Sequence, residues 1–240
     1  ALVPLVKETG ALFILDGVCA TAAVEEDMSK AYQGNPAYKI DIVLSGSQKA
    51  IGVPPGLLLL GFSKQALAAR EAMERIPAYY GDIKNWLPIM QNPGKYFATP
   101  AVNMFYAYEV AMQTVMNEGL ANRYRRHRVI ARALRAALAT YGMRALAAED
   151  VAAPTLSCVL YPEGIDDAAF RKALAAKGVV VAGALAGLAG KAFRIGHMGN
   201  TTLADFRLAL TTMAEVLNDL GHSVDAEQAI SVLDRVCQEK

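Results

Sequence analysis

The sequence predicts an α/β protein built from two α/β parts, and three observations carry this prediction. Short apolar runs rich in Val, Ile and Leu, such as residues 40–44 and 57–62, have the length of buried strands. Longer segments such as residues 101–117 place apolar side chains at helical spacing. From residue 155 onward, strand-like and helix-like segments alternate. Such alternation is typical of a small α/β unit, and the N-terminal runs are expected to belong to a larger α/β domain with a parallel-type sheet.

The N-terminal part opens on a helix that passes directly into a strand. The helical pattern of residues 1–9 ends at Gly10, which suits the left-handed position after a helix. Residues 11–15 form the first expected strand, and residues 40–44 and 57–62 form the next two. Ser63 is expected to cap a helix that runs through about residue 75. Four prolines between residues 76 and 100 exclude one long helix and indicate a connecting region.

The C-terminal part begins where Gly119 interrupts the helical pattern, so we expect domains at 1–118 and 119–240. Residues 120–141 form a second long helix, with Ile130, Leu134 and Leu138 inward and the arginines outward. The further expected elements are a strand at 155–161, a helix at 166–177, strands at 179–182 and 192–195, a helix at 202–220 and a final amphipathic helix at 225–236.

Composition and charge exclude several functional classes. Hydrophobic residues at 54% and charged residues at 20% are typical of a soluble globular protein. A net charge of +1 leaves no broad basic surface for nucleic acid or an anionic membrane. The basic cluster at residues 123–128 has Tyr124 as its one aromatic residue. We interpret it as a solvated or carboxylate-paired helix face rather than a nucleic-acid site.

Cysteine usage and hydropathy bear on the compartment. Cys19, Cys158 and Cys237 are widely spaced and form no paired motif, so we expect neither a disulfide framework nor a metal site. This pattern fits a reducing, cytoplasmic compartment. The longest clean apolar run, residues 56–62, is far shorter than the roughly 18 residues that span a bilayer. The first residues show no secretion signal.

Lys49 is the strongest candidate for chemistry, because it stands in a small-residue turn between two strand-like runs. A lysine with few neighbours to hydrate it favours the neutral amine, which can attack a carbonyl. Asp16 ends an earlier apolar run, and both residues fall at one edge of the sheet if their strands run parallel. This pair suits pyridoxal phosphate, whose aldehyde takes a lysine and whose pyridine nitrogen takes an anion. The alternatives are a solvated loop lysine and a turn or helix-capping aspartate.

These residues closely resemble the class V aminotransferases, and among them the alanine–glyoxylate and serine–pyruvate aminotransferases. The resemblance rests on Ser-Gly-Ser-Gln-Lys at 45–49 with Pro-Pro-Gly at 54–56, on Asp-Gly-Val at 16–18, and on Ala-Phe-Arg-Ile-Gly at 192–196. Tyr-Gly-Asp-Ile-Lys at 80–84 and Tyr-Phe-Ala-Thr-Pro at 96–100 follow the same family pattern in the same order. The resemblance runs from about residue 1 to residue 220.

The resemblance implies the fold of type I pyridoxal-phosphate-dependent transferases, which is the aspartate aminotransferase fold. Residues 1–118 are then the C-terminal part of the large cofactor-binding domain, and residues 119–240 are the small domain with an extra terminal helix. We expect the chain to be the C-terminal portion of a longer polypeptide. The missing N-terminal part would carry the turn that holds the cofactor phosphate and the aromatic ring that stacks on the pyridine.

The resemblance also implies roles for individual residues. Lys49 would form the Schiff base with the cofactor and then act as the general acid and base. Asp16 would pair with the pyridinium nitrogen. Val18 would pack against one face of the ring, and Gln48 would reach the phenolic edge of the cofactor or the substrate.

Three further positions are implied to act on the cofactor phosphate and the substrate. Tyr96 and Thr99 match positions that contact the phosphate from the neighbouring subunit, which implies a homodimer with a shared active site. Arg194 matches the position that holds the α-carboxylate of the substrate, and its guanidinium suits such a group. A strand arginine paired with a surface acid is the alternative. The small-residue run at 182–190 suits a loop that closes over the substrate.

The implied function is a pyridoxal-phosphate-dependent transaminase that moves an amino group from alanine or serine to glyoxylate or pyruvate. One alternative is that the chain has no activity of its own and serves as a structural or interaction component of such an enzyme. Another is a phosphonate-specific or pyridoxamine-specific transaminase on the same scaffold.

Overall fold

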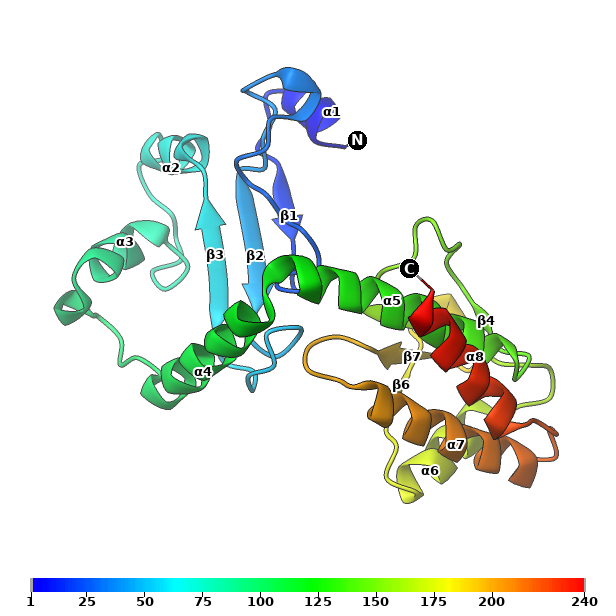
Figure 1. Ribbon diagram of the computed structural model, residues 1–240. Coiled ribbons are helices and arrows are strands. Elements are labelled where there is room, and N and C mark those ends of the chain that lie inside the picture. The colour runs from blue at the N-terminus through cyan, green and yellow to red at the C-terminus, as the bar shows by residue number, and fades with distance from the viewer. Residues whose placement is uncertain (1, 240) are drawn as a thin grey trace. The chain divides into compact units, whose positions relative to one another are not determined.

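The computed structural model describes residues 2–239 and divides into two compact units (Figure 1). Unit 1 comprises the chain through Val18 together with Glu26–Thr114, and unit 2 comprises Cys19–Glu25 together with the chain from Val115 onward. The segment that follows Val18 therefore packs with the C-terminal part of the chain.

Unit 1 is built around a three-stranded sheet with the order β1-β2-β3. Its elements are α1 (Leu2–Glu8), β1 (Ile14–Asp16), η1 (Tyr32–Gly34), β2 (Ile42–Gly46), β3 (Leu58–Phe62), α2 (Lys64–Glu71), α3 (Ile83–Gln91), η2 (Pro93–Lys95) and α4 (Val102–Glu118), which continues into unit 2.

The register of this sheet fixes the edge at which polar side chains gather. β1 and β2 run parallel, and Asp16 lies opposite Leu44. β2 and β3 run antiparallel, with Ser45 opposite Leu59. The described sheet therefore contains one parallel pair, β1 with β2, and one antiparallel pair, β2 with β3. A short loop joins β2 to β3, as antiparallel neighbours allow.

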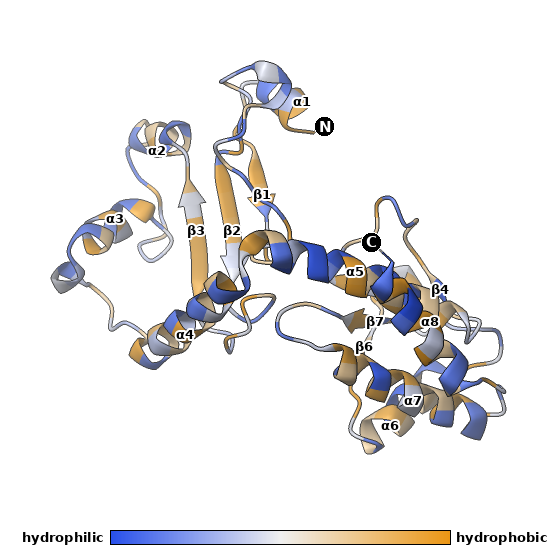
Figure 2. Cartoon of the chain, in the orientation of Figure 1, coloured by the Kyte–Doolittle hydropathy of each residue, from blue (hydrophilic) through white to orange (hydrophobic). Residues whose placement is uncertain are grey.

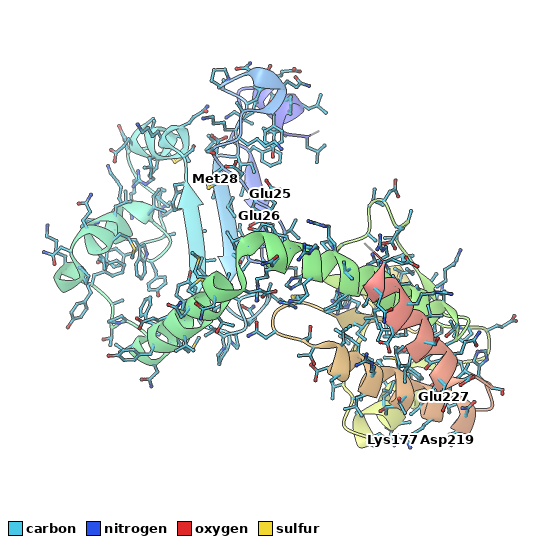
Figure 3. All side chains as sticks on the ribbon, viewed as in Figure 1. Glu25, Glu26, Met28, Lys177, Asp219 and Glu227 are labelled. Atoms are coloured by element: carbon cyan, nitrogen blue, oxygen red, sulfur yellow. The ribbon has the colours of Figure 1, made fainter. Side chains whose placement is uncertain are left out.

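The strands of unit 1 are less buried than their sequences predict. Figure 2 shows β1 and β2 as predominantly hydrophobic. Apolar side chains of β1 and β3 are nevertheless exposed to solvent: Ile14 of β1 is 56% exposed, and Leu58 and Leu60 of β3 are 65% and 43% exposed. The segment after residue 25 lays Met28 over β3 (Figure 3). A Cβ atom on Gly61 would lie 2.9 Å from Sδ of Met28. Any larger residue at position 61 would therefore require the Met28 side chain to move.

One buried carboxylate joins the elements at the other end of the sheet. Asp41 directly precedes β2, and its Oδ2 accepts hydrogen bonds from Nζ of Lys7 in α1 (2.7 Å) and from the backbone N–H of Phe13 (2.8 Å). Its Oδ1 accepts a hydrogen bond from the hydroxyl of Ser63 (3.0 Å), which caps α2. Asp41 thus ties α1, β1, β2 and α2 together.

Unit 2 is a four-stranded antiparallel sheet with the order β4-β5-β7-β6 and helices packed on it. Its elements are α5 (Leu120–Ala139), β4 (Arg144–Ala145), β5 (Leu156–Leu160), α6 (Asp167–Ala176), β6 (Ala182–Gly183), η3 (Ala186–Leu188), β7 (Ala192–Gly196), α7 (Leu203–Asp219) and α8 (Ala226–Gln238). The strand expected at 179–182 is reduced to the two residues of β6, and the expected closing loop at 182–190 contains β6 and η3.

The core of unit 2 confirms the inward face predicted for α5. Ile130, Leu134 and Leu138 are buried together with Phe193 of β7 and Leu233 of α8. α8 packs on α5 and α7 (Figure 1), so the terminal helix is part of the unit. At one end of the unit Lys177 pairs with Glu215 at 2.9 Å and lies beside Asp219 (Figure 3).

The burial of two sets of helical side chains differs from the usual pattern. Phe105, one of the apolar residues at helical spacing in 101–117, is 51% exposed on α4. The arginines of α5 were expected to point outward, but Arg123 is fully buried and Arg135 is 9% exposed. Both arginines are neutralised by carboxylates, Arg123 by Glu118 and Arg135 by Glu149, which makes the burial of their charge tolerable.

Candidate active site

Asp16 lies at the carboxyl end of β1, where the chain leaves the sheet. Its Oδ1 accepts a hydrogen bond from the backbone N–H of Val18 (3.0 Å), and the N–H of Gly17 donates to the carbonyl of Leu44 (2.8 Å). The aspartate therefore does form a turn, as the alternative from sequence required. Within residues 2–239, Oδ2 of Asp16 accepts no hydrogen bond, and the side chain is exposed. One carboxylate oxygen thus remains available to a ligand.

Lys49 lies in the loop between β2 and β3, at the same edge of the sheet as Asp16. The parallel register of β1 and β2 brings both residues there, as the sequence predicted. The side chain of Lys49 is half-buried, and in the described part of the chain its Nζ has no hydrogen-bond or ion-pair partner. This amine is open to a ligand.

Ser47 holds the loop that carries Lys49. Its side chain is fully buried. Its hydroxyl donates to the carbonyl of Pro54 (2.8 Å) and accepts from the N–H of Leu57 (3.3 Å). The backbone N–H of Ser47 donates to the carbonyl of Leu57, and the N–H of Val53 donates to the carbonyl of Ser47. The ends of the loop are therefore fastened to one residue, two positions before the lysine.

The glycine and glutamine of the same motif are also related in space. A Cβ atom on Gly46 would lie 2.5 Å from Oε1 of Gln48, so the Gln48 side chain folds back over the glycine. Gln48 is exposed. At the far end of the loop Gly56 has a φ of +147°, a backbone conformation that residues other than glycine rarely adopt. The backbone conformation therefore explains the glycine at position 56.

Arg194 lies in β7, between β5 and β6 of the sheet in unit 2. Phe193 and Ile195 on either side of it are buried, so Arg194 points to the other face of the sheet. Its Nε donates to the carbonyl of Gly183 (2.9 Å), which orients the guanidinium group. No carboxylate among the described residues pairs with it. The surface ion pair that was the alternative is therefore not formed, and both terminal nitrogens can bind an anion.

The remaining predicted residues are on the surface of unit 1. Val18 is half-buried, while Tyr96 is 58% exposed and Thr99 is exposed. No hydrogen bond in residues 2–239 joins Tyr96 or Thr99 to Asp16 or Lys49.

Two shallow cavities lie away from these residues. One of about 650 Å³ is lined by α5 and the chain around β4, including Arg132, Arg135 and Arg144. The other, of about 500 Å³, is lined by residues between Arg75 and Asn85. Neither contains a predicted site residue. The chemistry of the residue types, rather than concavity, therefore identifies the candidate site.

Sequence reasoning missed Ser47 as the residue that holds the loop, and Ser45 beside it. The Oγ atom of Ser45 is buried and has no hydrogen-bond partner among the described residues. The only sequence signal for both serines is their place in the small-residue motif. In residues 2–239, no group of three or more His, Cys, Asp and Glu side chains could hold a metal ion, and no helix is long and apolar enough to cross a membrane.

Comparison with protein families decides the relationship. A model of the family described as aminotransferase class-V matches residues 1–198. The chain belongs to the class V aminotransferases. This confirms the resemblance stated from the sequence motifs.

Individual aminotransferases match along most of this chain. It is 34% identical over 233 residues to an uncharacterized aminotransferase of Methanocaldococcus jannaschii, covering 97% of this chain and 58% of that protein. It is 32% identical over 242 residues to the pyridoxamine–pyruvate transaminase of Mesorhizobium japonicum, covering 98% of this chain and 60% of that protein. The crystal structure of ureidoglycine–glyoxylate aminotransferase from Bacillus subtilis matches with a TM-score of 0.88 at 28% identity, covering 100% of this chain and 62% of that one. The chain thus spans about three fifths of the length of these proteins.

Class V aminotransferases use pyridoxal phosphate and have the type I fold, so both expectations are confirmed at the level of the family. The residues of unit 1 fit this cofactor. Lys49, whose amine has no partner among the described residues, and Asp16, which has one unengaged carboxylate oxygen, lie at one edge of the sheet. The aldehyde of pyridoxal phosphate requires an amine, and its pyridine nitrogen requires an anion.

Proposed function

We propose that this class V aminotransferase moves an amino group from a small amino acid, such as alanine or serine, to a 2-oxo acid, such as glyoxylate or pyruvate. The observation that carries the proposal is the loop of Lys49, which Ser47 fastens at the sheet edge where Asp16 ends β1. The names of two relatives include pyruvate and glyoxylate as keto acids. The small amino donor rests on the motif resemblance.

In this proposal the residues of unit 1 bind the cofactor and move protons. Lys49 would hold pyridoxal phosphate through Nζ, and the same amine would carry a proton to and from the α-carbon of the substrate. Asp16 supports the positive charge of the pyridine nitrogen with its unengaged oxygen. Val18 packs on the ring, and Gln48 contacts the cofactor or the substrate. When bound, the cofactor supplies the electron sink for the α-carbon.

We assign Arg194 to the α-carboxylate of the substrate. Its guanidinium is oriented by Gly183 and has no acidic partner among the described residues, so it can offer two parallel N–H groups. Recognition of a carboxylate at this position serves amino acids and 2-oxo acids alike, because both carry the group.

The working enzyme is proposed to contain further polypeptide around unit 1. Several apolar side chains of unit 1 are more than half exposed, namely Leu58, Phe105, Tyr106 and Val110. This exposure supports the proposal that other polypeptide covers these surfaces in the assembled protein. We propose that an N-terminal part of the same protein and a second subunit cover them. The second subunit would receive Tyr96 and Thr99 at its cofactor phosphate, as in a homodimer.

A second candidate is favoured by the relative from Mesorhizobium japonicum, which is named for pyridoxamine and pyruvate. A pyridoxamine-specific enzyme would use the same lysine, but its amino donor has no α-carboxylate for Arg194 to bind. Alanine with glyoxylate and pyridoxamine with pyruvate should therefore be tested as alternative substrate pairs.

The proposal is tested by incubating the protein with pyridoxal phosphate, recording the absorption spectrum, reducing with borohydride and mapping the modified peptide. We expect a visible band and a pyridoxyl adduct on Lys49. K49A should lose the adduct, while K64A, which removes an exposed lysine at the start of α2, should keep it. A colourless wild-type protein without an adduct would instead support a chain with no activity of its own.

A further inference from the structure

A buried polar cluster joins the end of α4 and the start of α5 to the turn that follows β7. It consists of Glu118, Arg123, Arg126 and His127, and we call it the Glu118 cluster. Arg123 and His127 are fully buried. Arg123 donates from Nε to the carbonyl of Ala22 (2.8 Å) and from Nη1 to Oδ1 of Asn200 (3.2 Å). Arg126 donates from Nη2 to the carbonyl of Gly199 (2.9 Å) and from Nη1 to the carbonyl of Thr201 (3.4 Å).

Glu118 holds the two arginines in place. Its carboxylate accepts hydrogen bonds from Nη1 of Arg123 (2.7 Å) and from Nε of Arg126 (2.6 Å). The hydrogen bond from Arg126, helped by that from Arg123, outweighs burial and lowers the pKa of Glu118 to about 2. The carboxylate therefore stays ionised in any ordinary assay buffer.

His127 is held in one tautomer by its two neighbours. Its Nδ1 lies 2.8 Å from the carbonyl of Arg123, which can only accept, so Nδ1 carries the hydrogen. Its Nε2 accepts from the backbone N–H of Gly199 at 3.0 Å. A proton on Nε2 would face the Gly199 N–H and break this bond. The imidazole must therefore be neutral to hold the turn.

The charges around His127 also favour the neutral ring. Burial lowers its pKa, and the positive charges of Arg126 and Arg123 act in the same direction, while Glu118 opposes them. From the turn itself the titratable group that faces His127 is His197, which is also buried. His127 is thus built as a permanent hydrogen-bond acceptor at neutral pH.

The turn that the cluster holds begins at His197, directly after β7 ends at Gly196. β7 carries Arg194, three residues before His197. Gly199 at its centre has a φ of +79°, so the turn has a defined left-handed conformation. We infer that His127 is a positioning residue for binding of the substrate carboxylate, because it fixes the turn that fixes the end of β7 and hence Arg194. The inference rests on the role proposed for Arg194.

Two variants of His127 separate positioning from stability. H127Q keeps an acceptor for the Gly199 N–H but cannot be protonated, whereas H127L removes the acceptor at similar volume. In the holoenzyme we expect H127L to raise KM for the amino acid by about tenfold, with kcat changed less than about threefold. H127Q should keep KM near the wild-type value. As the pH falls from about 7 to about 5.5, KM should rise in the wild type more than in H127Q.

Amide hydrogen exchange supplies a readout that does not depend on activity. Residues 197–201 should exchange faster in H127L than in H127Q or the wild type. Y141F is the matched control, because it removes a buried hydrogen bond of unit 2, from the Tyr141 hydroxyl to the carbonyl of Leu210 (3.0 Å), far along α7 from this turn. It should lower the melting temperature and leave both KM and exchange at 197–201 unchanged.

The inference is overturned if H127L changes KM and the exchange of residues 197–201 no more than Y141F does, or if H127Q fails to restore them. If H127L does not fold, the pH dependence of KM in H127Q decides, because a slope equal to that of the wild type also overturns the inference. Failure of the proposed function gives another pattern. The wild type would then show no adduct on Lys49, whereas the exchange comparison could still be made.

Discussion

Ser47 shows how one hydroxyl can determine the geometry of a reactive side chain. Its Oγ donates to the carbonyl of Pro54 and accepts from the N–H of Leu57, which joins Ser47 to the far end of the Lys49 loop. We predict that S47A loosens the loop by about 1–3 kcal/mol, since two part-buried hydrogen bonds are lost. Affinity for pyridoxal phosphate should fall by about tenfold or more, because the position of Lys49 must then be fixed on binding.

Amide exchange of residues 48–57 and titration of the visible band measure these two effects. S29A is the control, because the Ser29 hydroxyl is exposed and bonds only the neighbouring Asp27 (2.6 Å). Unchanged exchange in S47A would show that the loop is held by its backbone hydrogen bonds and by the packing of the buried residues Ile51 and Val53.

The residues that the sequence could predict are those whose chemistry is local. Lys49 and Asp16 each follow a recognisable strand, so their common edge could be inferred from strand order alone. The burial of Arg123 could not be predicted, because it depends on Ala22 and Asn200, each more than 70 residues away in sequence. A basic run on a helix has the same sequence whether it faces water or a buried carboxylate.

Among the elements of unit 1, α1 and α2 are joined to the strands through the carboxylate of Asp41. The hydrogen bonds from Lys7, Phe13 and Ser63 outweigh burial and hold the pKa of Asp41 below its usual value. We predict that D41N destabilises unit 1 by about 2–3 kcal/mol, because the ammonium of Lys7 loses its charged acceptor while remaining largely enclosed. K7M in the D41N background should recover part of the loss, since no unpaired charge then remains.

Trp86 in α3 is the only tryptophan of the chain, so its fluorescence during urea unfolding reports on unit 1. D27N is the control, because Asp27 is an exposed carboxylate of the same unit. Equal midpoints for D41N and the wild type would mean that packing, rather than the Asp41 hydrogen bonds, joins these elements.

Element boundaries followed the sequence where a capping residue marks them. Ser63 caps α2 as predicted. The helices predicted at 166–177 and 202–220 begin at residues that prove to be caps, Asp166 for α6 and Thr202 for α7, and Thr202 forms a capping box with Asp205. The exposure of β1 and β3 was not predictable, because an apolar strand has the same sequence whether its partner lies within this chain or elsewhere. The same reason explains Phe105, an apolar residue of α4 that covers nothing in its own unit.

At the scale of the whole molecule, the histidines are distributed unequally. The chain has three, His127, His197 and His222, and all belong to unit 2. His197 is fully buried, and its Nε2 lies 2.9 Å from the hydroxyl of Ser157. Burial, with the charge of Arg135 acting in the same direction, lowers the pKa of His197 to about 4. Acid should therefore act on the two units differently.

The sign follows from proton binding. An unfolded histidine has a pKa of about 6.5, so below that pH the unfolded chain binds protons that folded His127 and His197 do not. The stabilisation is complete above about pH 6.5 and is lost as the pH falls toward the folded pKa, which for His197 is about 4. Between pH 7 and pH 5, His197 alone should lower the free energy of unfolding of unit 2 by about 2 kcal/mol. Carboxylates with a lowered pKa, such as Glu118, act at more acid pH.

Unit 1 contains no histidine, so it serves as an internal control for this prediction. Between pH 7 and pH 5, the protection of amides in α5 and α7, measured relative to the exchange rate of the unfolded chain at each pH, should fall, while the unfolding midpoint reported by Trp86 should stay nearly constant. H197Q should flatten the pH dependence of α5 and α7, because the glutamine does not titrate. Parallel acid sensitivity in both units would contradict the argument and would indicate that carboxylates, which both units contain, govern acid stability. If the prediction holds, mild acid loosens the unit that carries Arg194 before the unit that carries Lys49, and substrate recognition should fail at a higher pH than cofactor binding.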